Sequence, residues 1–313
     1  MNALILAAGH GTRLRPLTFY RAKASLPLLN VPFIQYPLQY LYLHQIKNAV
    51  INLHAHPESV QQAAGNQYQG IPIAYSHEKE ILGTAGAIKK ALPMLGDEPF
   101  VVMNADMLTY IPLTEAVDQH TRHGSDVTMV IMKAEPFASY GTLFFETEDS
   151  GSPRLSLSPS ERAAKFHYTG LQIVNPDMAE RIPADRKSDL LRDIYFACWQ
   201  ERKIHGFVYD GFWMEIGNLA EYLQTSLDLM EQPLPVALQP PAMQPTLISK
   251  EAIIEEDAHI KDSIIMDKAV VKRGSALDRC IIGSEVIVNG HYKKVALARG
   301  ILPWYIHTHD SRM

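Results

Sequence analysis

The sequence predicts an α/β protein with a Rossmann-like mixed, mostly parallel sheet flanked by helices, followed by a short C-terminal left-handed β-helix-like domain. Three observations lead to this prediction. Apolar runs of strand length alternate with helical stretches over about the first 230 residues, a Pro-rich stretch follows, and apolar residues then recur every five or six positions. These are the patterns of a layered α/β domain, a linker and a hexapeptide repeat.

The N-terminal region begins with a strand, helix, strand rhythm. Apolar runs at 3–7 and 49–53 flank a helical stretch at 33–46, and a second helix is expected at 57–64. Parallel strands need a crossover connection, usually a helix, so this order predicts a parallel sheet. Further strands are expected at 71–75, 100–104, 127–132, 142–146 and 171–174, and further helices at 84–92, 112–123, 188–201 and 218–230. We assign this domain to residues 1–231.

A linker and a small domain are expected after residue 231. Five prolines lie within residues 232–246, which favours extended, semi-rigid backbone. In residues 247–313 the apolar repeat consists of Ile254, Ile260, Ile265, Val271, Leu277, Ile282 and Val288. This spacing is typical of a hexapeptide β-helix, although a few ordinary short strands would also account for it. So small a β-helix is expected to be a cap or an oligomerisation surface, and we expect a homo-oligomer that forms through this domain.

Composition excludes several classes of protein. Hydrophobic residues make up 47% and charged residues 20% of the chain, which is typical of a soluble globular protein. The formal net charge of -5, without a long Lys/Arg run, does not provide the positive field that nucleic-acid binding needs. Cys198 and Cys280 lack the spacing of a disulfide scaffold or a zinc site. With no signal peptide and no apolar stretch of about 20 residues, we expect no membrane span and a cytoplasmic location.

The residues that follow the first strand predict a phosphate site. Gly9 and Gly11 stand where the backbone must turn tightly, and exposed amides in such a turn cradle phosphate oxygens. Arg13 and Arg15 add guanidinium groups, which suit phosphate geometry. Neither the dinucleotide fingerprint nor the P-loop pattern is present, which argues against an NAD-dependent oxidoreductase.

The whole string from Leu6 to Thr18 resembles the N-terminal signature of the sugar-1-phosphate nucleotidyltransferases, also called NDP-sugar pyrophosphorylases. In that family a downstream lysine completes the nucleotide site. Lys23 matches it, although Ala22 stands where the family has proline. The resemblance implies the nucleotidyltransferase fold, with Arg13 and Lys23 as catalytic residues that neutralise phosphate charge. It also implies a set of nucleotide-binding residues: Leu6, Ala7, Ala8, Gly9, Gly11, Thr12, Arg13 and Lys23.

Two further motifs resemble the nucleotide site of the same family. Glu78 precedes a Leu-Gly-Thr-Ala-Gly loop, which implies that Glu78, Gly83 and Thr84 contact the nucleotide, and we also expect Thr84 to cap the next helix. Asn104-Ala105-Asp106 resembles the family's Asn-Gly-Asp motif at the end of a strand. The resemblance implies that Asn104 binds nucleotide and that Asp106 is a catalytic residue and the first ligand of Mg²⁺, which prefers oxygen ligands.

The last matches concern the second metal ligand and the sugar. Trp213-Met214-Glu215-Ile216-Gly217 resembles the family's Trp-x-Asp-Ile-Gly segment, which implies that Glu215 is the second metal ligand despite its extra methylene. For the sugar phosphate, the resemblance implies a set of binding residues: Tyr140, Gly141, Lys165 and Gly170. Lys165 is only the nearest candidate, because the family's Glu-Lys-Pro motif is not cleanly present.

The resemblance implies that a nucleoside triphosphate and a sugar 1-phosphate are joined, with release of pyrophosphate. The presence of an acidic residue, Glu78, before the Leu-Gly-Thr-Ala-Gly loop resembles the pattern of mannose-1-phosphate guanylyltransferases. N-acetylmuramate-1-phosphate uridylyltransferases share much of this pattern. We therefore expect a mannose-1-phosphate guanylyltransferase. A uridylyltransferase acting on another sugar 1-phosphate, or a catalytically weak nucleotide-sugar binding regulatory subunit, remains as an alternative, the latter favoured by Ala22, Ala105 and Glu215.

Overall fold

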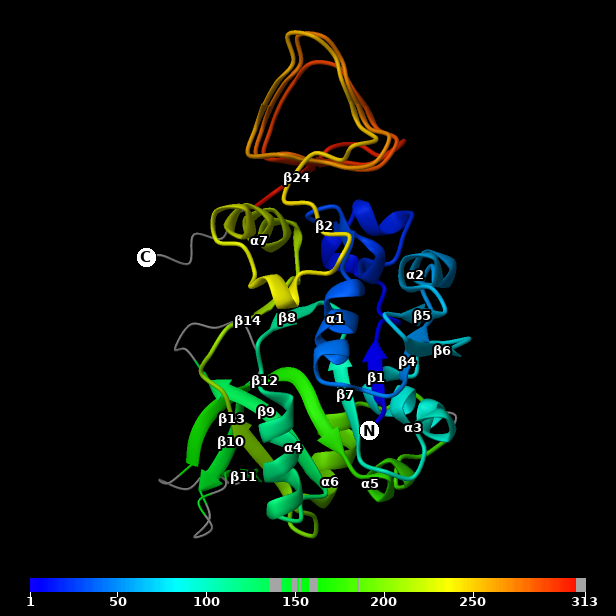
Figure 1. Cartoon of the computed structure of the whole chain (residues 1–313), viewed down its shortest axis with the longest axis vertical. Coiled ribbons are helices and arrows are strands. Elements are labelled where there is room, and N and C mark those ends of the chain that lie inside the picture. The colour runs from blue at the N-terminus through cyan, green and yellow to red at the C-terminus, as the bar shows by residue number, and fades with distance from the viewer. Residues whose placement is uncertain (135–141, 148–150, 152, 158–162, 185, 308–313) are drawn as a thin grey trace.

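One mixed sheet forms the centre of the larger part of the molecule (Figure 1). The computed structural model describes residues 1–134, 142–147, 151, 153–157, 163–184 and 186–307. Within them, ten strands pair in the order β10-β11-β13-β9-β12-β7-β1-β4-β6-β5. Their bounds are β1 Ala3–Leu6, β4 Ala49–Leu53, β5 Gln67–Tyr68, β6 Ile71–His77, β7 Phe100–Asn104, β9 Val127–Lys133, β10 Thr142–Thr147, β11 Pro153–Ser156, β12 Ala163–Val174 and β13 Ile204–Val208.

The sheet is parallel where the first motif lies and mixed beyond it, where β9 and β13 pair in parallel. β1 pairs in parallel with β4 and β7, and β4 pairs in parallel with β6. β12 then runs antiparallel to both β7 and β9. The carboxyl ends of β1, β4 and β7 therefore meet at one edge of the sheet, which is where α/β folds hold their ligands.

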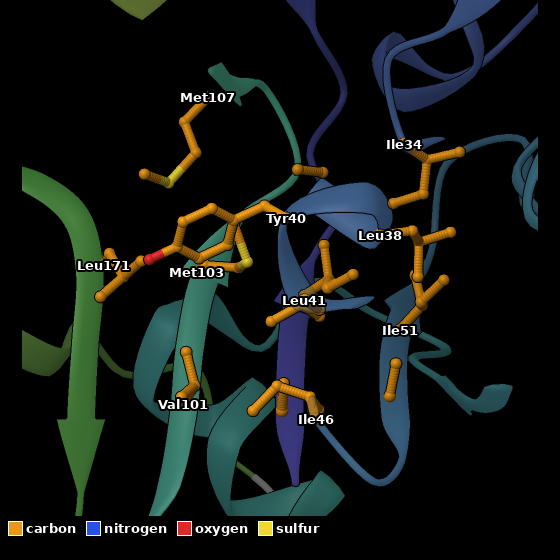
Figure 2. Packing of buried hydrophobic residues seen from close by; sticks show 14 of the residues in the cluster. Ile34, Leu38, Tyr40, Leu41, Ile46, Ile51, Val101, Met103, Met107 and Leu171 are labelled. Carbon is orange, nitrogen blue, oxygen red and sulfur yellow. The ribbon is translucent and has the colours of Figure 1, made fainter. Parts of the chain in front are cut away.

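Two layers of helices cover the two faces of the sheet. Residues alternate along each buried strand, so that Ile5 faces one hydrophobic cluster and Leu4 the other. α1 (Gln35–Leu43), α2 (Pro57–Ala64) and α4 (Leu113–Arg122) pack on the first face, and Figure 2 shows Leu38 and Leu41 of α1 lying over the strands. α3 (Gly83–Leu95) and α5 (Pro176–Glu180) pack on the second face.

The expected helix at 188–201 is replaced by a shorter and wider element. A π-helical turn covers Leu190–Tyr195 and passes into the short α6, Phe196–Cys198. Asp189 caps this turn by accepting a hydrogen bond from the Arg192 amide at 2.9 Å. Leu190, Ile194 and Tyr195 of the turn are buried in the second cluster, so tertiary packing sets the local geometry.

The C-terminal domain is a parallel β-helix whose coils form a triangle in Figure 1. Ile254 pairs with Val271 and Val271 pairs with Val288, which gives coils of 17 residues. The three stacks are β15 Ile253–Ile254, β18 Val270–Val271 and β21 Ile287–Val288; β16 His259–Lys261, β19 Ala276–Asp278 and β22 His291–Lys293; and β17 Ile264–Ile265, β20 Ile281–Ile282 and β23 Val295–Leu297, to which β24 Trp304–Tyr305 adds antiparallel. Parallel stacking of the repeat confirms the predicted arrangement, that of a left-handed β-helix.

A third hydrophobic cluster lies between the β-helix and the larger domain. It joins Leu14 and Leu17 of the first motif, Tyr222 of α7 (Leu219–Glu231), and Ile264 and Ile281 of the β-helix. The domain boundaries at 231 and 246 remain predictions, and a 3-10 turn at Val236–Leu238 lies between them.

Polar contacts from the first motif reach the same β-helix. The Tyr20 hydroxyl donates to the Arg299 carbonyl at 2.7 Å, and the Arg21 guanidinium donates to Ser284 Oγ at 3.4 Å. The ring of Phe19 lies edge-on to that of Trp304. The segment between Gly11 and Lys23 therefore packs against the C-terminal domain. Across the described ranges, no helix combines the length and apolarity that crossing a membrane requires.

Candidate functional site

A cleft of about 420 Å³ lies at the carboxyl edge of β1, β4 and β7. Every residue expected from the resemblance to bind the nucleotide lines it. These residues are Leu6, Ala7, Ala8, Gly9, Gly11, Thr12, Arg13, Lys23, Glu78, Gly83, Thr84, Asn104 and Asp106. The cleft also has lining residues that the motifs did not predict as ligands: Ala24, Asn52, Ile81, Ala105 and Gly217. Its size suits a nucleotide.

The loop after β1 is tightly folded over the segment that carries Lys23. Gly11 has a φ of 60°, and a Cβ there would lie 3.0 Å from Thr18 Cγ2 and 3.1 Å from Lys23 Cβ. The Thr18 hydroxyl in turn donates to the Gly11 carbonyl at 2.8 Å. The short 3-10 turn Thr12–Leu14 follows and carries Arg13. Glycine at position 11 thus lets the loop after β1, which we call the phosphate loop (residues 7–11), pack against Lys23, the expected catalytic lysine.

Lys23 and Asp106 form an ion pair inside the cleft. Lys23 begins a 3-10 turn, Lys23–Ser25, and its Nζ donates to Asp106 Oδ2. Asp106 follows the end of β7, and the side chains are 16% and 15% exposed, respectively. The expected catalytic lysine and the expected first metal ligand therefore meet at one point, still open to a ligand.

Glu215 joins this group from a different part of the chain. It ends β14 (Trp213–Glu215), which pairs with β8 (Met107–Thr109), so that Glu215 lies opposite Met107. Burial raises the pKa of Glu215, the Asp106 carboxylate raises it further, and Lys23 and Arg13 oppose the rise. Two carboxylates and two cations hence act on each other electrostatically at the cleft.

The donor set fits a divalent cation that is completed by the substrate. In the part of the chain that the structure describes, no group of three or more His, Cys, Asp or Glu side chains is placed to hold a metal. Magnesium, however, usually takes one or two carboxylates with water and phosphate oxygens. Asp106 and Glu215 supply that number. Burial and then the Asp106 charge raise the pKa of Glu215, and a bound cation would offset both effects.

Glu78 is buried at the side of the cleft, and one of its hydrogen-bond partners belongs to none of the motifs. Asn52, the fourth of the five residues of β4, donates from Nδ2 to Glu78 Oε1 at 2.7 Å, and the Leu82 amide donates to Glu78 Oε2 at 2.9 Å. His54 Nδ1 lies 3.0 Å from the Glu78 carbonyl oxygen, which gives His54 a structural partner. An asparagine within an otherwise apolar, fully buried strand is the signal in the sequence that would have revealed Asn52.

The expectation that Thr84 caps the next helix is wrong. α3 begins at Gly83, and its N-cap residue Leu82 makes no side-chain cap. Thr84 Oγ1 instead accepts a hydrogen bond from the Leu190 amide at 3.0 Å, which fastens the loop to the π-helical turn. Gly83 has a φ of 73° and no room for a Cβ beside the Ser188 carbonyl, so the loop packs directly on that segment.

The residues expected to bind the sugar phosphate are only partly placed. Gly170 has a φ of 88°, and a Cβ there would lie 2.5 Å from Asn104 Nδ2, so Gly170 packs against a residue of the cleft. Lys165 is exposed on β12 and is not among the residues that line the cleft. Tyr140 and Gly141 lie outside the described residues.

Comparison with known proteins now decides the family. The nucleotidyl transferase family model matches residues 2–232. The chain belongs to the nucleotidyl transferase family. A second model, the GlmU-like C-terminal hexapeptide, matches residues 237–293. The resemblance seen in the sequence and both parts of the fold are thereby confirmed, and nucleotidyltransferases of this family generally use a divalent metal.

Several relatives of this nucleotidyl transferase carry related names. It is 33% identical over 227 residues to mannose-1-phosphate guanyltransferase beta-A of Xenopus laevis, covering 71% of this chain and 63% of that protein. It is 29% identical over 310 residues to mannose-1-phosphate guanylyltransferase catalytic subunit beta of Danio rerio, covering 90% and 86%. It is 29% identical over 320 residues to probable mannose-1-phosphate guanylyltransferase 2 of Arabidopsis thaliana, covering 97% and 86%.

Proposed function

We propose that this nucleotidyl transferase moves a guanylyl group from GTP to mannose 1-phosphate and releases pyrophosphate. The observation that carries the proposal is that Arg13, Lys23 and Asp106 line one nucleotide-sized cleft. Glu215, which is not among the lining residues, interacts electrostatically with all three. The names of the relatives support the choice of substrates, since three of them are called mannose-1-phosphate guanylyltransferases or guanyltransferases.

The chemistry needs no nucleophilic side chain. A phosphate oxygen of the sugar 1-phosphate forms a new bond to the α-phosphorus, and the bond from that phosphorus to the β-phosphate bridging oxygen breaks. Amides of the glycine loop hold the phosphates, while Arg13 and Lys23 place positive charge beside them. Magnesium held by Asp106 and Glu215 supplies further positive charge on the phosphate oxygens when bound. The chain mainly aligns the two phosphates and offsets their repulsion.

The base and the sugar are assigned to opposite sides of the phosphates. We assign guanine to the side of Glu78, because a carboxylate accepts the N–H donors of that base. We assign mannose 1-phosphate to the side of Gly170 and Lys165, with Tyr140 and Gly141 as further candidates. Support for Gly170 comes from its close packing on Asn104, which lines the cleft.

A second candidate is a regulatory subunit that binds nucleotide sugar and turns over slowly. It is favoured by Glu215, whose side chain is one methylene longer than the family's aspartate, and by Ala22 and Ala105, which replace motif residues. A uridylyltransferase acting on another sugar 1-phosphate is the other alternative, because its motifs are similar.

A screen of pyrophosphate release separates these candidates. Purified protein with magnesium is given GTP, UTP, dTTP, CTP or ATP together with mannose 1-phosphate, glucose 1-phosphate or N-acetylmuramate 1-phosphate. We expect the fastest release with GTP and mannose 1-phosphate. Fastest release with UTP would favour the uridylyltransferase, and tight binding of GDP-mannose without release for any pair would favour the regulatory subunit.

We further propose that two copies associate through the outer face of the β-helix. Ile253, Val270 and Ile287 stack along that face, and Ile253 and Ile287 are 57% and 68% exposed. Because Ile253 and Ile287 flank Val270 equally, a two-fold axis through Val270 would cover both isoleucines at once. Sedimentation of Ile287→Asp should give a monomer, while Val236→Asp, at an exposed site in the linker, should leave the dimer intact.

A further inference from the structure

Asn52 is a buried polar residue that lines the cleft but belongs to none of the four motifs. It lies in β4, whose other residues are apolar, and it is 3% exposed. A buried amide in an apolar strand costs free energy unless its donors and acceptor are satisfied. The partners of Asn52 therefore indicate why a polar residue lies there.

The partners of Asn52 fix the orientation of its amide. The Ala7 backbone N–H lies 2.6 Å from Asn52 Oδ1, and a backbone N–H only donates, so the oxygen must face β1. Nδ2 then faces Glu78 Oε1 at 2.7 Å and donates to it. The other carboxylate oxygen of Glu78 accepts from the Leu82 amide at 2.9 Å. A continuous chain of hydrogen bonds thus runs from the phosphate loop through Asn52 and Glu78 to the start of α3.

We infer that Asn52 is a positioning residue for nucleotide selection, which orients the Glu78 carboxylate so that it offers only acceptors to the base. This inference rests on the proposed guanylyl transfer and specifies how the base is chosen. Each Glu78 oxygen has a second lone pair beyond its bond to Asn52 or Leu82, and Glu78 lines the cleft. The geometry leaves these lone pairs for the ligand.

The chemistry of the bases explains the resulting preference. Guanine carries neighbouring N–H donors at N1 and N2, which an acceptor-only carboxylate binds. Uracil and thymine carry one N–H between two carbonyl oxygens, so a carboxylate that meets the N–H also approaches a carbonyl oxygen and is repelled. A site built around such unpaired acceptors rejects the wrong base more strongly than an apolar pocket does.

An amide and acid exchange tests the inference. In Asn52→Asp two carboxylates face each other, and in Glu78→Gln an amide N–H meets an N–H donor, so each single variant mismatches the chain of hydrogen bonds. The double variant, which combines Asn52→Asp with Glu78→Gln, restores the match. Its new acid accepts from the Ala7 amide and from the new side-chain amide, whose oxygen accepts from Leu82. The hydrogen-bond chain is then complete, but the acceptor-only group is gone from the base side.

The measurements are the melting temperature and the affinities for GTP and for UTP, determined by calorimetry with magnesium and without sugar phosphate. We expect both single variants to melt lower and the double variant to regain most of the loss. The ratio of GTP to UTP affinity should fall roughly tenfold or more in the double variant, as expected for a lost charged hydrogen bond. Asn175→Asp, an amide change outside the cleft, should leave the ratio unchanged.

Three results would overturn the inference. One is a double variant that keeps the wild-type preference for GTP, which would make Asn52 and Glu78 structural only. Another is a double variant that melts as low as the single ones, which would contradict the assigned hydrogen bonds. The third is a wild-type chain without preference for GTP. Failure of the proposed function is a separate result, since it is seen as absence of pyrophosphate release with GTP and mannose 1-phosphate while binding remains measurable.

Discussion

Lys23 Nζ donates to Asp106 Oδ2, joining two residues that are 83 positions apart in the chain. Both side chains are largely but not fully buried, so the pair is shielded from bulk water while still reachable by a ligand. A lysine that is already oriented beside a carboxylate loses little side-chain entropy when a polyphosphate arrives. The ion pair therefore holds the Lys23 ammonium group in position before a ligand binds.

Asp106→Asn should abolish most of the turnover and leave the fold intact. The substitution keeps the shape of the side chain and removes the charge, and loss of one electrostatic contact at a reacting centre lowers kcat by roughly 100- to 1000-fold. The melting temperature should move by no more than about 2 °C, because the site is open to solvent on one side. Asp118→Asn, on the exposed surface of α4, is the matched control for kcat. Full activity of Asp106→Asn would remove Asp106 from the mechanism.

Glu215→Gln should raise the magnesium concentration needed for half-maximal rate. Burial and Asp106 raise the pKa of Glu215, and a bound cation would offset both effects. Removing that charge weakens metal binding more than it changes phosphate contacts, so we expect roughly a tenfold shift in the magnesium titration. Removing the metal with EDTA should stop the wild-type reaction, and added magnesium should restore it. An unchanged titration curve would contradict the assignment of Glu215 as a ligand.

Gly170→Ala should impair substrate binding through Asn104. The new Cβ would meet Asn104 Nδ2 at 2.5 Å, so the amide that lines the cleft must move. We expect KM for the nucleotide or the sugar phosphate to rise severalfold. Gly274→Ala is the matched control, because it has a comparable positive φ of 66° but meets nothing within 4 Å. Equal effects of the two variants on KM would attribute the change to backbone strain alone.

His120 should make the fold less stable at acidic pH. Burial lowers the pKa of His120 from its ordinary value of 6.5, against the opposing influence of Asn175 and Asp126. As the pH drops from 6.5, this histidine takes up a proton more readily in the unfolded chain than in the folded one. The free energy of unfolding therefore falls with the pH. Urea unfolding at about pH 8 and about pH 5.5 measures the slope, and His120→Asn should reduce it. A slope that is unchanged in the variant would assign the acid sensitivity to other groups.

Ile281 and Ile282 are neighbours on β20 that face different clusters, which allows a matched comparison. Both are fully buried, Ile281 in the cluster between the domains and Ile282 in the interior of the β-helix. Replacing either one by alanine should lower the free energy of unfolding by about 2–5 kcal/mol. Only Ile281→Ala should also raise KM for the nucleotide, because its cluster includes Leu14 and Leu17, which follow the phosphate loop. Calorimetry of GTP binding in both variants distinguishes the two effects.

Much of the fold and of the cleft was accessible from the sequence because the signals are local. Strand β1 is a continuous apolar run and β7 is apolar up to Asn104, and the 17-residue coils follow from the spacing of apolar residues. The glycine loop and Asp106, which line the cleft, can be predicted because they lie in contiguous motifs. The short strands β8 and β14 were missed, since each has three residues and is defined only by its pairing with the other.

The features that the sequence did not predict depend on contacts between residues that lie far apart in the chain. The sequence predicts a local capping role for Thr84, but its hydroxyl oxygen accepts a hydrogen bond from the amide of Leu190, 106 positions away. Asn52 belongs to none of the motifs. Its role depends on its hydrogen bonds to Ala7 and Glu78, which lie in other segments of the chain. The π-helical turn at Leu190–Tyr195 likewise depends on burial of its apolar residues rather than on helix propensity.

The contacts that Tyr20 and Arg21 make with Arg299 and Ser284 have a practical consequence for protein engineering. A chimaera that borrows its C-terminal coils from a relative would replace the surface against which residues 12–23 are seated. Such an exchange needs to carry the matching N-terminal segment with it. Grafts made at the proline-rich linker alone would separate surfaces that have been fitted to each other.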